Sequence, residues 1–178
     1  MGNLICIIGG ANQGKSYYTK QQLNKVEDAP CLVYDVQGAY GDSSTKDGDI
    51  IMNLPLTRDG KDKRARYYGN ENDFIAIAQR RRGTNIVIEE ATIFFQGMTA
   101  SNMRRLMVDR FHHRNNIYIM FHSINAVNPR ILEMSDFIVL FKTGDDPSII
   151  KRKYGKLLEP FLKLQKMEQR SKLIIKNI

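Results

Sequence analysis

Residues 7–16 of the chain read IIGGANQGKS. From Gly9 to Ser16 it fits the spacing Gly-x-x-x-x-Gly-Lys-Ser of the phosphate-binding loop with no mismatch. The apolar run LICII at 4–8 predicts a buried strand before the loop, and YYTKQQLNKV at 17–26 predicts a helix after it. In a strand–loop–helix unit, backbone N–H groups and the helix N-terminus together hold a phosphate. The stretch therefore predicts an α/β nucleotide-binding protein, the alternative being a glycine-rich turn without a ligand.

The loop contains most of the side chains expected to contact a nucleotide. We expect Lys15 to reach the β and γ oxygens of ATP and the Ser16 hydroxyl to hold Mg²⁺. ATP and Mg²⁺ are therefore the expected ligand and cofactor. The predicted nucleotide-binding residues are Gly9, Gly10, Ala11, Asn12, Gln13, Gly14, Lys15, Ser16 and Tyr17.

Strand and helix patterns alternate along the rest of the chain. Strands are expected at 3–8, 30–36, 85–90, 116–122 and 136–142, and helices at 15–26, 71–82, 99–113 and 128–135, with Gly83 ending the helix at 71–82. Residues 38–66 are polar and glycine-rich, so we expect a surface loop interrupted by a short strand near IIMNL at 50–54. Strands separated by helices predict a three-layer αβα fold with a mostly parallel central sheet and helices on both faces.

The length of 178 residues suits one α/β domain. We expect an ATPase core at 1–145 and a basic, helical C-terminal extension at 146–178 that packs on the same domain. Pro147 and Pro160 interrupt this extension, and KLIIKNI at 172–178 is a candidate edge strand. The chain has no apolar run of the ~20 residues that a membrane-spanning helix needs and no signal-peptide pattern, so we expect a cytoplasmic protein, virion-associated if it is viral.

The net charge of +8 lies mostly at the C-terminus, where residues 147–178 carry nine basic and two acidic side chains. Such a segment is typical of a polyanion-binding surface, although each single lysine also fits a solvated helix face. The stretches QRRR at 79–82 and RDGKDKRAR at 58–66 are further candidates. Few aromatic residues are interleaved with these cations, which favours phosphate contacts over base stacking. The expected partner is nucleic acid, with DNA as the first candidate.

Two adjacent carboxylates, Glu89 and Glu90, follow the apolar strand NIVI at 85–88. The carboxyl ends of parallel strands meet at the edge of the sheet where the phosphate loop lies. We therefore expect Glu89 to support Mg²⁺ beside Ser16 and Glu90 to act as the general base for the attacking water. The alternative is that the pair only starts an exposed helix, where acids favour the first turn.

Four motifs in this order resemble the FtsK–HerA superfamily of P-loop motors, in particular viral genome-packaging ATPases and filamentous-phage (Zot-like) assembly ATPases. They are GGANQGKS, the strand NIVIEE, YDVQGAY at 34–40 and RFHHRNNIYIMFHS at 110–123. The resemblance spans about residues 3–145 and implies a P-loop NTPase fold of the ASCE/RecA-like type. It also implies an ATP-hydrolysing motor that translocates or packages nucleic acid as a ring of identical subunits, with a virion or membrane-vertex protein as a further candidate partner.

The same resemblance implies roles for four more side chains. An arginine finger that enters the neighbouring subunit's site falls on Arg114, with Arg110 second, and the polar sensor at the end of the fourth strand falls on His122 or Ser123. Each has a structural alternative, as a helix cap, a surface pair or an ordinary strand-end histidine. The chain departs from the family pattern in three ways: Glu89 replaces Asp, His122-Ser123 replaces Thr or Ser followed by Gln, and Ala39 replaces Glu.

Two other functions fit the same motifs. An assembly or secretion ATPase would hydrolyse ATP without translocating nucleic acid. A small nucleoside or metabolite kinase would use RDGKDKRAR as a lid, but the adjacent glutamates suit water activation, and a kinase must exclude that water.

Overall fold

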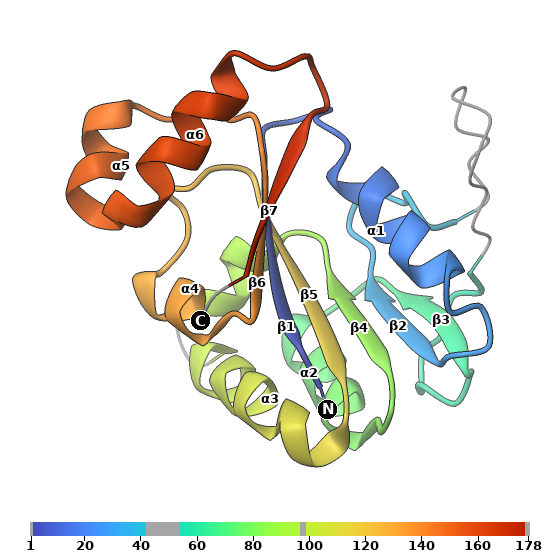
Figure 1. Ribbon diagram of the computed structural model, residues 1–178. Helices are drawn as coiled ribbons and strands as arrows, with labels where there is room; N and C mark the ends of the chain where they lie inside the picture. The colour runs from blue at the N-terminus through green and yellow to red at the C-terminus, as the bar shows by residue number, and fades with distance from the viewer. Residues whose placement is uncertain (1, 42–53, 97–98, 177–178) are drawn as a thin grey trace.

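The computed structural model describes residues 2–41, 54–96 and 99–176, and a seven-stranded sheet runs through it (Figure 1). In chain order the elements are β1 (Leu4–Ile8), α1 (Lys15–Asn24), β2 (Cys31–Tyr34), β3 (Arg64–Tyr67), α2 (Glu71–Arg80), β4 (Asn85–Ile88), the 3₁₀ helix η1 (Ala91–Phe95), α3 (Thr99–His113), β5 (Asn116–Phe121), α4 (Pro129–Met134), β6 (Phe137–Phe141), α5 (Pro147–Tyr154), the 3₁₀ turn η2 (Gly155–Leu157), α6 (Leu158–Gln165) and β7 (Lys172–Lys176).

The strand order is β3-β2-β4-β5-β1-β6-β7, and every pair is parallel except β6–β7. This order confirms the predicted α/β fold with a mostly parallel sheet. Because β5 lies between β1 and β4, the carboxyl ends of these three strands are neighbours. The segments that follow them, namely the phosphate loop, the glutamate pair and His122, therefore emerge at one edge of the sheet.

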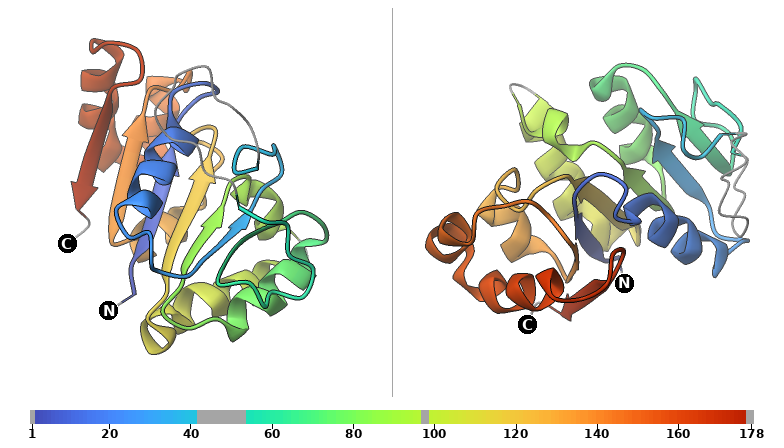
Figure 2. Two further views of the ribbon diagram at one scale, coloured as in Figure 1. Left: turned by 90° about the vertical axis from the view of Figure 1, so that its right-hand side faces the viewer. Right: turned by 90° about the horizontal axis from the view of Figure 1, so that it is seen from above.

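Apolar side chains cover both faces of the sheet, as expected for strands buried on both sides. One core cluster contains Tyr18 and Leu23 of α1 with residues such as Ile7 and Val33 of the strands. The other contains residues of α2 and α3, including Phe74 and Met103. Figure 2 shows α1 and the α2–α3 pair on opposite faces of the sheet.

The strand β3 was not predicted, because it lies within the segment 38–66 expected to be a loop. Its sequence RARY alternates charged and apolar residues, and only Ala65 and Tyr67 are buried. Pairing with β2 makes it a strand, although its composition is that of a surface loop. Of the strand expected near 50–54, only Leu54 lies within the described residues, and it belongs to no strand.

The other strands and helices to which the sequence analysis gave bounds lie where they were expected; the helix at 99–113 has the same bounds, and the others are shorter at one or both ends. The helix expected at 71–82 ends at Arg80, and Arg81 is already extended. Gly83 therefore does not end this helix but stands in the turn before β4, with a positive φ of 61°.

The C-terminal segment joins the core of the rest of the chain. Pro147 occupies the first turn of α5 behind the N-cap Asp146, and Pro160 lies in the first turn of α6, where a missing N–H costs little. Phe161 and Leu164 of α6 belong to the same core cluster as α2 and α3. The candidate edge strand is confirmed as β7, while the boundary at residue 145 stays a prediction. Within the described ranges, no helix combines the length and apolar character needed to cross a membrane.

Candidate nucleotide-binding site

The phosphate loop leaves β1 through glycines that the packing requires. The Gly9 N–H donates to the Phe121 carbonyl at 3.0 Å, and a Cβ atom on Gly9 would lie 2.6 Å from the Cβ of Phe141. Gly14 has φ 97°, a left-handed conformation that disfavours other residues, and it is the N-cap of α1. The glycines therefore let the loop pass close to the ends of β5 and β6 and enter α1 at a fixed angle.

Lys15 is buried and folds back over the loop. Its Nζ donates to the carbonyl oxygens of Gly9 at 2.7 Å and Gly10 at 2.9 Å, and lies 3.3 Å from His122 Nδ1. Burial lowers the pKa of Lys15, while the nearby Glu89 and Glu90 raise it. The ammonium group is thus held at the mouth of the loop, where the expected phosphate oxygens would lie.

Ser16 and Glu89 meet as the sequence predicted. The Ser16 Oγ donates to Glu89 Oε1 at 2.7 Å, while the buried Glu89 Oε2 has no hydrogen-bond partner in the part of the chain that is described. Burial raises the pKa of Glu89 to about 7 and Asp35 adds to the rise, against the opposing effects of the Ser16 hydrogen bond and two lysines. A buried carboxylate oxygen without a partner beside a hydroxyl is suited to a hard cation, so these residues fit Mg²⁺.

Glu90 turns to a different partner from Glu89. Its Oε2 lies 2.9 Å from His122 Nε2, and its side chain is one-quarter exposed. Because the Lys15 ammonium can only donate, His122 Nδ1 accepts from it and His122 Nε2–H donates to Glu90. Although Glu90 stands at the N-cap of η1, its side chain makes no capping hydrogen bond, which argues against the helix-start alternative.

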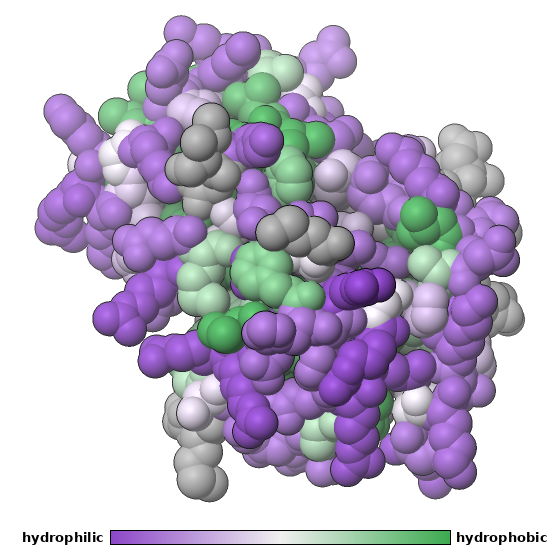
Figure 3. Space-filling view, turned by 60° about the horizontal axis from the view of Figure 1, so that its bottom comes forward, coloured by the Kyte–Doolittle hydropathy of each residue, from purple (hydrophilic) through white to green (hydrophobic). Residues whose placement is uncertain are grey.

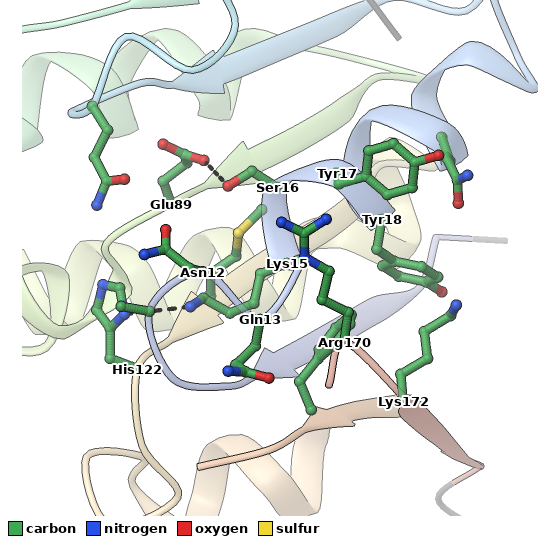
Figure 4. Close-up of a pocket in the computed structure, with 16 residues that line it drawn as sticks. Asn12, Gln13, Lys15, Ser16, Tyr17, Tyr18, Glu89, His122, Arg170 and Lys172 are labelled. Carbon is green, nitrogen blue, oxygen red and sulfur yellow. Dashed lines mark hydrogen bonds between the residues drawn. The ribbon is translucent and has the colours of Figure 1, made fainter. Parts of the chain in front are cut away.

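Lys15, Ser16, Glu89 and His122 line one pocket of about 690 Å³, whereas Glu90, the partner of His122, is not among its lining residues (Figure 4). Six of the predicted loop residues from Ala11 to Ser16 line it, together with Tyr17, Glu89 and His122. Sequence reasoning missed the other lining residues, which are Tyr18, Gln21, Gln37, Met120, Phe141, Arg170 and Lys172. Gln21 stands one helical turn after Tyr17 and Tyr18 one turn after Gly14, but no sequence signal connects Arg170 and Lys172 to a loop some 150 residues earlier.

The loop after β2 brings Gln37 to the pocket despite the loss of an acid at Ala39. Asp35 is buried and accepts hydrogen bonds from the N–H groups of Ala39 at 2.8 Å and Tyr40 at 3.1 Å. These bonds fold residues 35–40 into a turn, and Gln37 at its tip lines the pocket. The turn therefore depends on Asp35 and on main-chain groups, which Ala39 supplies as well as Glu would.

The structure separates the two sensor candidates. His122 contacts both Lys15 and Glu90 inside the site. Ser123 instead accepts a hydrogen bond from the Ala126 N–H at 3.1 Å, which closes a local turn, and it does not line the pocket. A sensor role thus stays a prediction for His122 and loses its support for Ser123.

Arg110 is a structural residue, which corrects its prediction as a finger. It is 5% exposed, and its guanidinium donates to the carbonyl of Met107 at 2.7 Å and pairs with Asp136 at 3.2 Å. Asp136 also accepts from the Leu4 N–H at 2.7 Å. Arg110 therefore fixes the end of α3 to the start of β1, and its side chain is not available to another subunit.

Arg114 is exposed and lies between α3 and β5 with φ 55°. It stands at the amino end of β5, whereas the nucleotide site lies at the carboxyl end. The six residues of β5 separate the two ends by roughly 20 Å at the rise of a strand. Arg114 does not reach the site of its own chain, and its role as a finger for a neighbouring subunit stays a prediction.

Two of the three basic segments form one surface at the amino-terminal edge of the sheet. Arg81 Nη2 donates to the Asp62 carbonyl at 2.6 Å and joins the loop at 58–63 to the end of α2. The exposed cations of this surface, which we call the basic edge, are Arg58, Lys61, Lys63, Arg80 and Arg82. The surface at this end of the molecule is mostly hydrophilic, with small separate apolar areas (Figure 3).

Comparisons with known proteins agree with the fold. No protein-family model and no curated sequence matches the chain. The structure is similar to the genome packaging NTPase B204 from Sulfolobus turreted icosahedral virus 2 in complex with ATP-gammaS, with a TM-score of 0.76 and 16% identity over 99% of this chain and 92% of that one.

Two further structures are similar. B204, the DNA-packaging ATPase from Sulfolobus turreted icosahedral virus, matches with a TM-score of 0.67 and 17% identity over 99% of this chain and 98% of that one. The N-terminal domain of zonular occludens toxin from Neisseria meningitidis matches with a TM-score of 0.54 and 13% identity over 85% of this chain and 90% of that one. The chain therefore has the P-loop NTPase fold, in a form that resembles both a viral genome-packaging NTPase and a zonular occludens toxin domain.

Proposed function

We propose that this protein is an ATP-hydrolysing motor that packages or translocates nucleic acid. The observation that carries the proposal is the arrangement of the two adjacent glutamates around Lys15. Glu89 accepts a hydrogen bond from Ser16 at 2.7 Å. Glu90 lies 2.9 Å from His122, which in turn contacts Lys15. A phosphate loop alone binds nucleotide, whereas a second carboxylate with its own polar partner is suited to activating water. The similarity to a packaging NTPase solved with ATP-gammaS supports the same interpretation.

The mechanism divides the work among five side chains. Lys15 and the loop amides bind the β- and γ-phosphates, since they face the pocket from the tip of β1. Ser16 and Glu89 would hold Mg²⁺, which neutralises charge on the phosphate oxygens when it is bound. Glu90 accepts the proton of the attacking water, and His122 orients the Glu90 carboxylate by donating from Nε2.

A motor that works on every sequence must grip phosphates. The basic edge lies at the opposite end of the sheet from the pocket and carries five exposed cations, balanced in part by the Lys61–Asp59 pair at 3.0 Å. Exposed cations on α5, namely Lys151, Arg152 and Lys153, form a second candidate. We propose that nucleic acid binds one of these surfaces and that a ring of subunits surrounds it.

The distance between Arg114 and the site of its own chain supports the proposed ring, because Arg114 can act as a finger only on a neighbouring subunit. A finger that acts on a neighbour completes the charge balance of the transition state. We further propose that the protein works in the host cytoplasm or on the virion, where a virion or membrane-vertex protein is a candidate partner.

The test is phosphate release from Mg·ATP with and without DNA, combined with oligomeric state in a non-hydrolysable ATP analogue. The proposal expects DNA to stimulate turnover and the analogue to produce a closed oligomer. Glu90→Gln is the control that excludes a contaminating ATPase, because it leaves the loop intact. Transfer of phosphate to an added nucleoside or metabolite would instead identify a kinase.

An assembly or secretion ATPase without translocation is the second candidate, favoured by the similarity to the zonular occludens toxin domain. It predicts the same nucleotide dependence and turnover that is indifferent to DNA. The DNA arm of the experiment therefore separates the two functions.

A further inference from the structure

The pocket has a second end that the hydrolysis mechanism leaves unassigned. Glu89 and His122 line the end where the γ-phosphate is expected. The opposite end is lined by Tyr17, Tyr18, Arg170 and Lys172, and Figure 4 shows the Arg170 guanidinium directed toward the loop beside both tyrosines. Arg170 and Lys172 belong to the turn and strand that add β7 to the edge of the sheet.

The turn before β7 packs against the phosphate loop. Gln165 Nε2 donates to the Thr143 carbonyl at 3.0 Å, and Lys142 Nζ donates to the Met167 carbonyl, so two bonds tie the end of α6 to the segment after β6. A Cβ atom on Gly14 would lie 3.9 Å from the Cβ of Arg170, which places the backbone of Arg170 against the first turn of α1.

The backbone of Arg170 itself is in an uncommon conformation. Its φ of 66° is left-handed, which costs free energy in a residue other than glycine and persists only where the surrounding structure holds it, as in tight turns and ligand sites. Lys172 Nζ lies 5.4 Å from the centroid of the Tyr18 ring, and Tyr18 packs edge-on against Phe141 with centroids 6.2 Å apart. A cation and an aromatic wall are thus held together at this end of the pocket.

The expected direction of the bound triphosphate follows from the end of the pocket that Glu89 and His122 line. With the γ-phosphate beside Glu89 and the loop amides on the β-phosphate, the α-phosphate and the nucleoside extend along the first turn of α1 toward Tyr17 and Arg170. A planar guanidinium binds phosphate oxygens and stacks on aromatic rings, including a nucleobase. This chemistry matches the nucleoside end of ATP.

We propose that Arg170 binds the nucleoside monophosphate part of ATP, at the α-phosphate and base, and that Lys172 positions the Tyr18 ring that faces the same part. The inference rests on the proposed function, because it assigns residues to the same nucleotide site. It also removes two of the nine C-terminal cations from the nucleic-acid surface and makes β7 a wall of the nucleotide site.

The experiment compares two probes by calorimetry at one Mg²⁺ concentration: ATP, which has an α-phosphate and a nucleoside, and inorganic pyrophosphate, which supplies only the two phosphates expected at the loop. The variants are Arg170→Ala and Arg170→Gly, where glycine removes the guanidinium and also relieves the left-handed backbone. Lys176→Ala, at the far end of the same strand, is the matched control. Thermal unfolding of each variant is measured beside the binding data.

We expect both Arg170 variants to weaken ATP binding roughly 10-fold or more, as for a lost hydrogen bond to a charged group, with pyrophosphate affinity unchanged. An equal loss for both probes, or no loss for either, would overturn the inference. Weaker DNA binding with unchanged ATP affinity would also overturn it and return Arg170 to the nucleic-acid surface. If the unmodified protein binds neither probe, the proposed function fails instead, so the two failures are distinct.

Discussion

Glu89 and Glu90 are adjacent in the sequence but face different partners, because successive side chains of an extended chain point to opposite sides. Glu89 turns inward to Ser16 and is 6% exposed, while Glu90 turns to His122 at the pocket rim. Glu89 is therefore placed to bind a cation, whereas the Glu90 carboxylate is accessible to water.

Replacing Glu90 by Gln should abolish water activation while leaving nucleotide binding intact. General-base catalysis contributes roughly 10²–10⁴ in rate, so we expect turnover to fall by that factor with an unchanged ATP dissociation constant. Phosphate release and calorimetry measure the two quantities. The exposed Glu159, changed to Gln, is the matched control, and retention of turnover in Glu90→Gln would remove the general-base assignment.

The buried, ionised Glu89 carboxylate should lower the free energy of unfolding of the protein when Mg²⁺ and nucleotide are absent. Its pKa in the folded protein is about 7 because of burial, above the ordinary 4.5, so the unfolded state loses its proton at lower pH. The free energy of unfolding then falls as pH rises from 4.5 to 7, by about 3 kcal/mol in total.

Glu89→Gln should remove this dependence on pH. Urea unfolding in a chelator should show the variant more stable than the unmodified protein at about pH 8.5 by up to about 3 kcal/mol and nearly equal to it at pH 4.5. A difference that does not change with pH would contradict the assigned cause. In Mg·ATP the same variant should be inactive, since the buried oxygen that fits the cation is gone.

At the scale of elements, the turn after β2 depends on one buried carboxylate. Asp35 accepts two main-chain hydrogen bonds and lies 3.9 Å from the Arg66 guanidinium of β3. It therefore joins the turn that carries Gln37 to the unpredicted strand β3.

Asp35→Ala should destabilise the protein by about 2 kcal/mol, because hydrogen bonds to a charged group are lost and two N–H groups lose their acceptor. The nucleotide affinity should also fall, because Gln37 is no longer held at the pocket. Urea unfolding and calorimetry measure these effects, with the exposed Asp59→Ala as control. A wild-type affinity in a destabilised variant would show that Gln37 does not contact the nucleotide.

At the scale of the whole molecule, Arg114 and the nucleotide site lie at opposite ends of β5. Arg114→Ala should abolish turnover in the assembled protein and leave ATP binding unchanged, with a loss of roughly 10³–10⁵ for a true finger. Mixing Arg114→Ala subunits with Glu90→Gln subunits provides a sharper test. Where the two kinds of subunit are neighbours, the Arg114→Ala subunit supplies an intact Glu90 site and the Glu90→Gln subunit supplies an intact arginine finger. Activity should therefore return in the mixture, whereas each variant alone stays inactive.

Binding to nucleic acid should depend steeply on salt. For about four neutralised phosphates, log affinity should fall with log salt at a slope of roughly −3.6. If the basic edge is the grip, Arg80→Ala combined with Arg82→Ala should make the slope shallower by about 2. The paired change Lys151→Ala with Arg152→Ala on α5 is the comparison, and a larger effect there would move the grip to α5. A salt-insensitive interaction would contradict both surfaces.

The sequence by itself predicted the unit of β1, phosphate loop and α1, because glycine spacing and apolar periodicity are local and their physical requirements are strict. It also placed Glu89 and Glu90 at the end of β4, since two acids that close a buried strand are costly unless a cation or a polar partner meets them. It misread β3, because RARY becomes a strand only through pairing with β2. It also misread Arg110, whose partner Asp136 is 26 residues away.

The packing of the strands determines which distant residues share the site. The strand order brings the ends of β1, β4 and β5 together, and with them Lys15, Glu89 and His122. The antiparallel addition of β7 returns the chain to the phosphate loop and places Arg170 at the pocket. Local patterns fix elements, because they depend on neighbouring residues; contacts between elements depend on the register and order of the sheet, which no short stretch of sequence contains.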